Sequence, residues 1–175
     1  MKRSLLALSL LAFVASVSAD GGTFVGINAG QSTLASSSLA SDQGRAFGVF
    51  VGHDYDKYAG IVWGAEGAYN SLGNFGGVGG ERGYIEEIDA TLVGTRYFND
   101  ANTLGLYGKV GIDHTWVSGY GQVFDNSGYT YGFGLRYLAT QKIEARLGYQ
   151  YYGIGSASPM FGHESVVNLG AAYHF

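Results

Sequence analysis

The C-terminal segment 167–175 alternates between apolar side chains and small or polar ones. The apolar series is Val167, Leu169, Ala171, Tyr173 and Phe175, and the positions between them include Asn168, Gly170 and His174. A period of two with one apolar face is typical of a β-strand. Chain termini fray unless something holds them, and a closed barrel holds its last strand against its first. The segment therefore favours a barrel that its C-terminal strand closes.

The N-terminal segment has the pattern of an export signal. A short basic start precedes the apolar stretch 5–17, which is too short to cross a bilayer as a helix. Small residues then suit cleavage before Asp20. We expect a signal peptide over 1–19 and one domain over 20–175, with an N-terminal anchor helix as the alternative.

The composition fits strands and excludes several other classes. Thirty glycines accompany one proline and no cysteine, while 46% of the residues are hydrophobic and 15% are aromatic. Tyr and Phe favour strands, and glycine makes room inside a narrow barrel. The net charge of −4 comes without a basic patch, which makes nucleic acid an unsuitable partner. No later segment reaches 18 apolar residues, so a membrane protein of this composition must be a barrel; the alternative is a soluble periplasmic or secreted sandwich.

The alternation of apolar with small or polar residues recurs in eight segments. The connections between these segments are long and short by turns. These segments are 23–30, 45–55, 58–69, 84–98, 104–117, 129–138, 143–152 and the terminal strand. We place a tight turn at Asp56 and Lys57, a Ser-rich loop from Ser32 and a Gly-rich loop from Asn70. Even strand numbers with alternating loop lengths are typical of outer-membrane barrels. The sequence predicts an all-β fold, an eight-stranded antiparallel up-and-down transmembrane β-barrel.

The phase of each strand predicts which side chains face the lumen. For 84–98 the phase is ambiguous, and we place Val93 and Tyr97 outward so that Arg96 faces inward. The charged residues expected in the lumen are Glu66, Arg96, Lys109, Asp113, Arg136, Glu144 and Arg146. Aromatic belts are expected at two interfaces, with Tyr55, Tyr97, Tyr137, Tyr173 and Phe175 at one, and Tyr69, Trp116 and Tyr151 at the other. An eight-stranded interior is only wide enough for side chains, so these charges must pair.

The whole mature chain resembles the OmpA/OmpX-like eight-stranded outer-membrane barrels. The segments that carry this resemblance are 24–26, 64–69, 134–137, 145–151 and 169–175. The resemblance implies a C-terminal assembly signal at Asn168, Gly170, Tyr173 and Phe175, read by the barrel-assembly machinery. It also implies a lumenal salt-bridge network with Glu66, Lys109 and Arg146 at matching positions. Arg136 stands where the family has an acidic residue, which departs from its pair-swapping gate. We expect no peptidoglycan-binding domain after the barrel.

The resemblance implies the bacterial outer membrane, with its lipids and lipopolysaccharide as partners, and a structural or adhesion-like role through four extracellular loops. We expect an acidic outer rim from Asp42, Glu81, Glu86, Glu87, Asp125 and Glu164, which could meet a host-surface ligand. One alternative is a narrow gated pore for ions or small solutes. A second is a lipid A-modifying enzyme that uses His163 and Ser165. We expect no enzyme activity, no cofactor and no metal, because no motif surrounds these residues.

Overall fold

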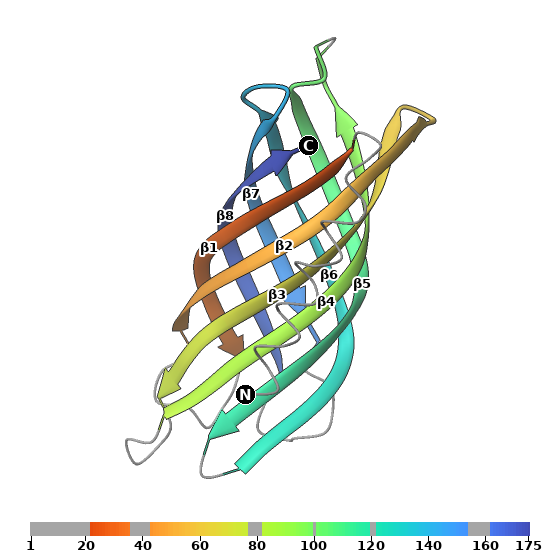
Figure 1. Cartoon of the computed structure of the whole chain (residues 1–175). Coiled ribbons are helices and arrows are strands. Elements are labelled where there is room, and N and C mark those ends of the chain that lie inside the picture. The colour runs from red at the N-terminus through yellow and green to blue at the C-terminus, as the bar shows by residue number, and fades with distance from the viewer. Residues whose placement is uncertain (1–21, 36–42, 77–81, 100, 120–121, 154–161) are drawn as a thin grey trace.

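The computed structural model describes residues 22–35, 43–76, 82–99, 101–119, 122–153 and 162–175. Eight β-strands lie within these residues, and each pairs antiparallel with the next (Figure 1). Their bounds are β1 Thr23–Ala35, β2 Gln43–Tyr58, β3 Ile61–Gly76, β4 Arg82–Tyr97, β5 Leu104–Gly119, β6 Gln122–Leu138, β7 Ile143–Tyr152 and β8 His163–His174. The predicted eight-stranded antiparallel fold is confirmed.

Pairing of the first and last strands closes the barrel. The β1–β8 ladder runs from Phe24 opposite His174 to Ala35 opposite His163. The Phe175 N–H also donates to the Thr23 carbonyl at 3.0 Å, so the terminal aromatic is tied to the start of β1. Among the described residues, no helix has the length and apolar character needed to cross a membrane.

The two ends of the barrel differ in their connections. Short connections at 59–60, 98–103 and 139–142 gather at one end, here named the turn end, where Phe175 also lies (upper end in Figure 1). The opposite end, here named the loop end, is where the strands enter the other four connections. This separation follows from up-and-down topology, since every second connection returns to the same end.

The first turn and several strand ends differ from the predictions. The predicted turn at Asp56 and Lys57 is wrong: β2 continues to Tyr58, and Ala59 and Gly60 turn the chain with φ of 53° and 82°. Two successive positive φ values suit the right-handed twist of a hairpin, and glycine adopts one of them without strain. At the loop end β1 and β3 extend beyond the predicted strand ends, because a backbone ladder does not require apolar side chains.

The outward face is apolar along the strands. Ile112, Phe133 and Leu169 are each more than half exposed, which suits contact with lipid rather than water. The predicted phase of β4 is wrong. Val93 is only 5% exposed and faces inward, whereas Leu92 is 50% exposed. The inward face of β4 carries two carboxylates and two threonines, and a single arginine was too weak a guide to its phase.

Inside the barrel, two apolar clusters are separated by polar layers. The cluster nearer the turn end consists of Phe24, Phe50, Ala68 and Ala172. The cluster nearer the loop end consists of Leu34, Ala46, Leu72, Phe75, Ile85, Val117, Tyr152 and Val166. The charged side chains described below occupy the lumen beside and between these clusters.

Candidate functional site

Glu66 on β3 is the centre of the first set of ion pairs. Lys109 Nζ on β5 lies 3.1 Å from Glu66 Oε1, and the Arg146 guanidinium on β7 binds Glu66 Oε2 across the lumen. Alternation along each strand turns all three side chains inward. Each is at most 9% exposed. The carboxylate is therefore held between two cations from strands that lie on different sides of the barrel.

Arg136 on β6 is the centre of the second set. It is 1% exposed, and its Nε donates to Glu144 Oε2 at 3.0 Å. Its other nitrogens donate to Asp54 Oδ2 at 3.0 Å and to Thr95 Oγ1 at 2.8 Å. Glu144 also accepts from Arg146, which joins the two sets into one network. His174 Nε2 lies 3.1 Å from Glu144 Oε2.

Aromatic rings pack against the Arg146 guanidinium within the same layer. Its Cζ lies 4.5 Å from the Phe50 ring centroid and 4.8 Å from that of Phe24. Gly26 and Gly52 make room for these rings, because a Cβ at either position would overlap one of them. Cation–π contact and ion pairing therefore fix the same guanidinium.

We name these six paired groups the ion-pair network. It contains three cations, Lys109, Arg136 and Arg146, and three carboxylates, Glu66, Glu144 and Asp54. Charges balance within it, which is the condition for burying ions at tolerable cost. The Arg146–Glu66 pair joins β7 to β3 across the lumen.

The structure brings together five of the predicted lumen residues, Glu66, Lys109, Arg136, Glu144 and Arg146. Asp113 faces inward but lies outside this network. The predicted lumenal position of Arg96 was wrong, because the phase of β4 turns this side chain to the exposed outer face. Asp54 was missed, although alternation from Gly52 places it inward and could have found it.

A second group of acidic side chains lies toward the loop end. We name it the carboxylate layer; its members are Glu87, Asp89, Asp113 and Glu164, at 0%, 6%, 4% and 0% exposure. The expected rim positions of Glu87 and Glu164 were wrong, because both residues lie within paired strands that turn their side chains inward. Asp42 and Glu81 lie outside the described residues. Asp125 is exposed, and Glu86 accepts from the Tyr69 hydroxyl.

Neutral donors serve the carboxylate layer. Asn70 Nδ2 donates to Glu87 Oε2 at 2.8 Å, and Gln150 Nε2 donates to Asp89 Oδ2 at 3.0 Å. Within the described residues, one oxygen each of Glu87, Asp89 and Asp113 and both oxygens of Glu164 lack a hydrogen-bond partner. The layer thus differs from the ion-pair network in having no cation of its own.

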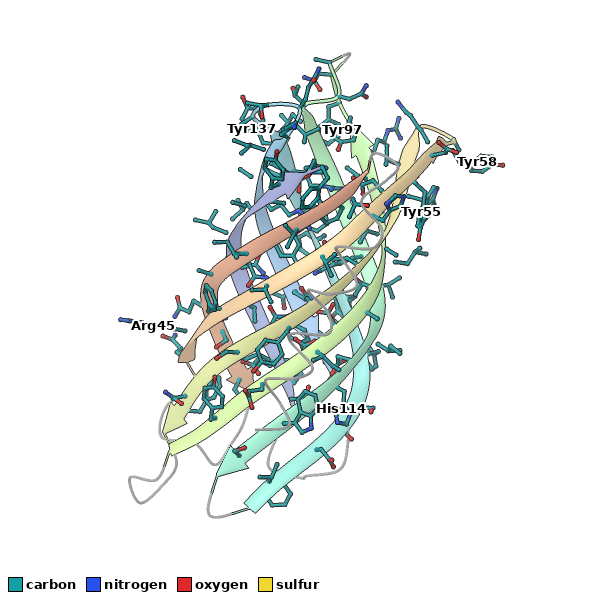
Figure 2. The ribbon with its side chains drawn as sticks, viewed as in Figure 1. Arg45, Tyr55, Tyr58, Tyr97, His114 and Tyr137 are labelled. Atoms are coloured by element: carbon teal, nitrogen blue, oxygen red, sulfur yellow. The ribbon has the colours of Figure 1, made fainter. Side chains whose placement is uncertain are left out.

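The outward face carries the other predicted residues. Tyr173 and Phe175 are 42% and 51% exposed, and their rings meet edge to face at 5.4 Å. Tyr55 and Tyr137 project outward at the turn end, whereas Tyr97, expected with them, follows the inward phase of β4 (Figure 2).

The ring of His163 stacks on that of Tyr151, with ring centroids 5.1 Å apart. Among the described residues, no group of three or more acidic, His or Cys side chains is placed to hold a metal ion.

A polar hollow of about 800 Å³ opens on the outside of the barrel near the loop end. Its polar side chains are Gln31, Gln43, Arg45, Ser71, Asn74 and Tyr84, from β1 to β4. Gln31 donates to Gln43 at 2.9 Å, and the Tyr84 hydroxyl donates to Ser71 at 2.8 Å. Arg45 projects away from the barrel (Figure 2). Sequence reasoning missed this hollow because strand pairing brings its residues together across positions that were expected to be loops.

Comparisons with known proteins agree with this architecture. The family model described as "Outer membrane protein beta-barrel domain" matches residues 4–175. Ail of Yersinia pestis, solved with the heparin analogue sucrose octasulfate, superposes with a TM-score of 0.61 at 19% identity, over 89% of this chain and 99% of Ail. Neisserial surface protein A gives a TM-score of 0.60 at 16% identity, over 88% of this chain and 97% of that one.

The outer membrane enzyme PagL also superposes, with a TM-score of 0.54 at 13% identity, over 85% of this chain and 97% of PagL. No curated protein matches the sequence significantly. Ail, which is named an attachment invasion locus protein, and PagL, which is named an enzyme, thus share this fold. The fold alone does not decide between such roles.

Proposed function

The chain belongs to the outer membrane protein β-barrel domain family, and we propose that it is a closed, non-conducting outer-membrane barrel that acts through surface interactions at its loop end. In this family topology the loop end is extracellular and the turn end periplasmic. We further propose that residues 1–19 are a cleaved signal peptide and that Asn168, Gly170, Tyr173 and Phe175 serve the barrel-assembly machinery.

The ion-pair network is the observation that carries the closed lumen. Arg136 and Glu144 are 1% and 0% exposed, which supports a lumen that has no continuous water path beside them. The apolar cluster that includes Leu34 and Phe75 adds a second obstruction nearer the loop end. A barrel closed twice is suited to presenting its outer ends rather than to conducting solutes.

Planar-bilayer recording tests the closed lumen. We expect the wild-type barrel to show no stable conductance, since the paired side chains span the lumen. Arg96→Leu is the matched control, because it removes an outward arginine and should leave the recording unchanged. A stable, ion-selective conductance in the wild type that Glu66→Gln alters would favour the narrow pore instead.

The polar hollow supports a partner for the outer face. Arg45 supplies a guanidinium to the hollow, and Gln31, Gln43 and Asn74 supply amides. Guanidinium and amide donors suit a phosphorylated sugar. We propose that the hollow contacts the headgroup of lipopolysaccharide in the outer leaflet.

Lipopolysaccharide retained by the purified barrel measures this contact. Arg45→Ala should lower the amount that copurifies per barrel, since it removes the guanidinium of the hollow. Arg96→Ala provides a control at the opposite interface and should retain the wild-type amount. If the wild type and both variants retained equal amounts of lipopolysaccharide, the proposed contact at the hollow would be wrong.

A further inference from the structure

Asp89 on β4 and Asp113 on β5 face each other directly in the ladder of the two strands. Both side chains point into the lumen, and they are 6% and 4% exposed. Directly opposite Cβ atoms in a sheet lie about 4.5–5.5 Å apart, a spacing at which like charges repel. Two buried carboxylates in such positions require a compensating positive charge.

The cations of the lumen are already committed. Lys109 is the cation that interacts with Asp89, but its ammonium donates to Glu66 at 3.1 Å. Arg136 and Arg146 bind Glu144, Asp54 and Glu66. Within the described residues, the three buried cations therefore match three other carboxylates.

Apart from Lys109, the neighbours of the pair inside the lumen are acidic or neutral. The titratable and charged groups around it are Glu66 from β3, Glu87 from β4, Lys109 and His114 from β5, Tyr152 from β7 and Glu164 from β8. His114 lies on the other face of β5, where its Nδ1 is 2.9 Å from Ser127 Oγ. The remaining polar neighbours, Asn70, Thr115, Thr130 and Gln150, are neutral. None of these groups supplies a further positive charge inside the layer.

The hydrogen-bond pattern also leaves room for a proton. Each aspartate accepts one neutral hydrogen bond, from Gln150 to Asp89 and from Thr115 to Asp113, through its Oδ2 atom. The Oδ1 atom of each has no donor among the described residues. A buried carboxyl with an unpartnered oxygen is satisfied if one of the two groups carries a proton and donates it.

We propose that the Asp89–Asp113 pair is a proton-binding site inside the barrel, at which the two carboxyl groups share one proton at neutral pH. Glu87, two positions from Asp89 on the same inward face, extends the site. The apolar cluster around Leu34, Phe75 and Ile85 separates it from the loop end. Release of the proton leaves two adjacent buried anions, which favours entry of water into this half of the lumen.

Infrared spectroscopy of the barrel labelled with 4-¹³C aspartate tests the site directly. The folded, full mature barrel is measured in a detergent without ester groups, so that the only labelled carboxyl signals come from aspartate. The wild type should show a protonated aspartate band at neutral pH, which disappears as the pH is raised. Asp113→Asn should abolish or shift this band, whereas Asp125→Asn, which changes an exposed carboxylate on β6, should leave it intact.

Two results would overturn the proposal. One is a wild-type spectrum that shows ionised aspartate alone at neutral pH, a result that needs no variant to fold. The other is a protonated band that persists unchanged in both Asp89→Asn and Asp113→Asn. Neither result depends on conductance, so the proposed closed lumen is tested separately.

Discussion

The ion-pair network and the carboxylate layer fill neighbouring parts of one lumen by opposite means. In the network, Arg146 touches two carboxylates and three aromatic rings. In the layer, Glu87 and Asp89 rely on the amides of Asn70 and Gln150. One part of the lumen therefore holds oppositely charged pairs, and the other holds carboxyl groups without a cation of their own. Removing one charge should lower the stability of the barrel more in the first part than in the second.

The largest effect is expected from Arg146→Leu. The substitution leaves Glu66 with Lys109 alone and removes one of the donors to Glu144. Breaking a buried pair from one side typically costs about 3–5 kcal/mol. Urea unfolding in lipid vesicles should show a loss of that order. Lys142→Leu, at an exposed turn position, is the control and should cost less than about 1 kcal/mol.

A somewhat smaller loss is expected when a charge is placed on the lipid face beside the network. Leu147 neighbours Arg146 but is 47% exposed on the outer side of β7. An arginine facing the bilayer midplane costs about 2–4 kcal/mol. Leu147→Arg should therefore shift the urea midpoint downward, and a neutral result would mean that the inward and outward faces of β7 are reversed.

The smallest effect is expected at Arg96, which lies on the outer face at the turn end. Arg96→Ala should change the unfolding free energy by less than about 0.5 kcal/mol, as for most surface substitutions. Arg136→Ala should instead cost several-fold more, because Arg136 is 1% exposed and binds both Asp54 and Glu144. Similar losses at the two arginines would contradict the phase of β4.

Sequence reasoning predicted the fold because its signals were repeated. Alternation in β5, β6 and β7 indicates which residues face inward, so the sequence alone places Lys109, Arg136 and Arg146 in the lumen. In β4 the pattern failed, since Leu92 and Val93 are adjacent and either phase presents an apolar face. Only pairing with β3 and β5 resolves the choice.

The carboxylate layer could not be predicted for a related reason. Glu87 and Glu164 lie near the ends of apolar alternation, where polarity alone indicates a loop. Their burial depends on how far the ladders β3–β4 and β7–β8 continue, which is set by backbone hydrogen bonding between strands. Asp89 and Asp113 face each other because of the register between β4 and β5. That register depends on both strands together, so neither segment alone predicts it.

Within the described residues, the lumen combines a charge-balanced network with an acidic layer that has no cation of its own, and matched glutamine substitutions test this difference most directly. Glu66 and Glu87 are 5% and 0% exposed and face inward from neighbouring strands. Urea unfolding of Glu66→Gln and Glu87→Gln in the same vesicles compares them. Glu66→Gln should lose about 3–5 kcal/mol, because Lys109 and Arg146 lose their shared carboxylate, and Glu87→Gln should change stability by less than about 1 kcal/mol. Equal losses, or a larger loss for Glu87→Gln, would contradict the account.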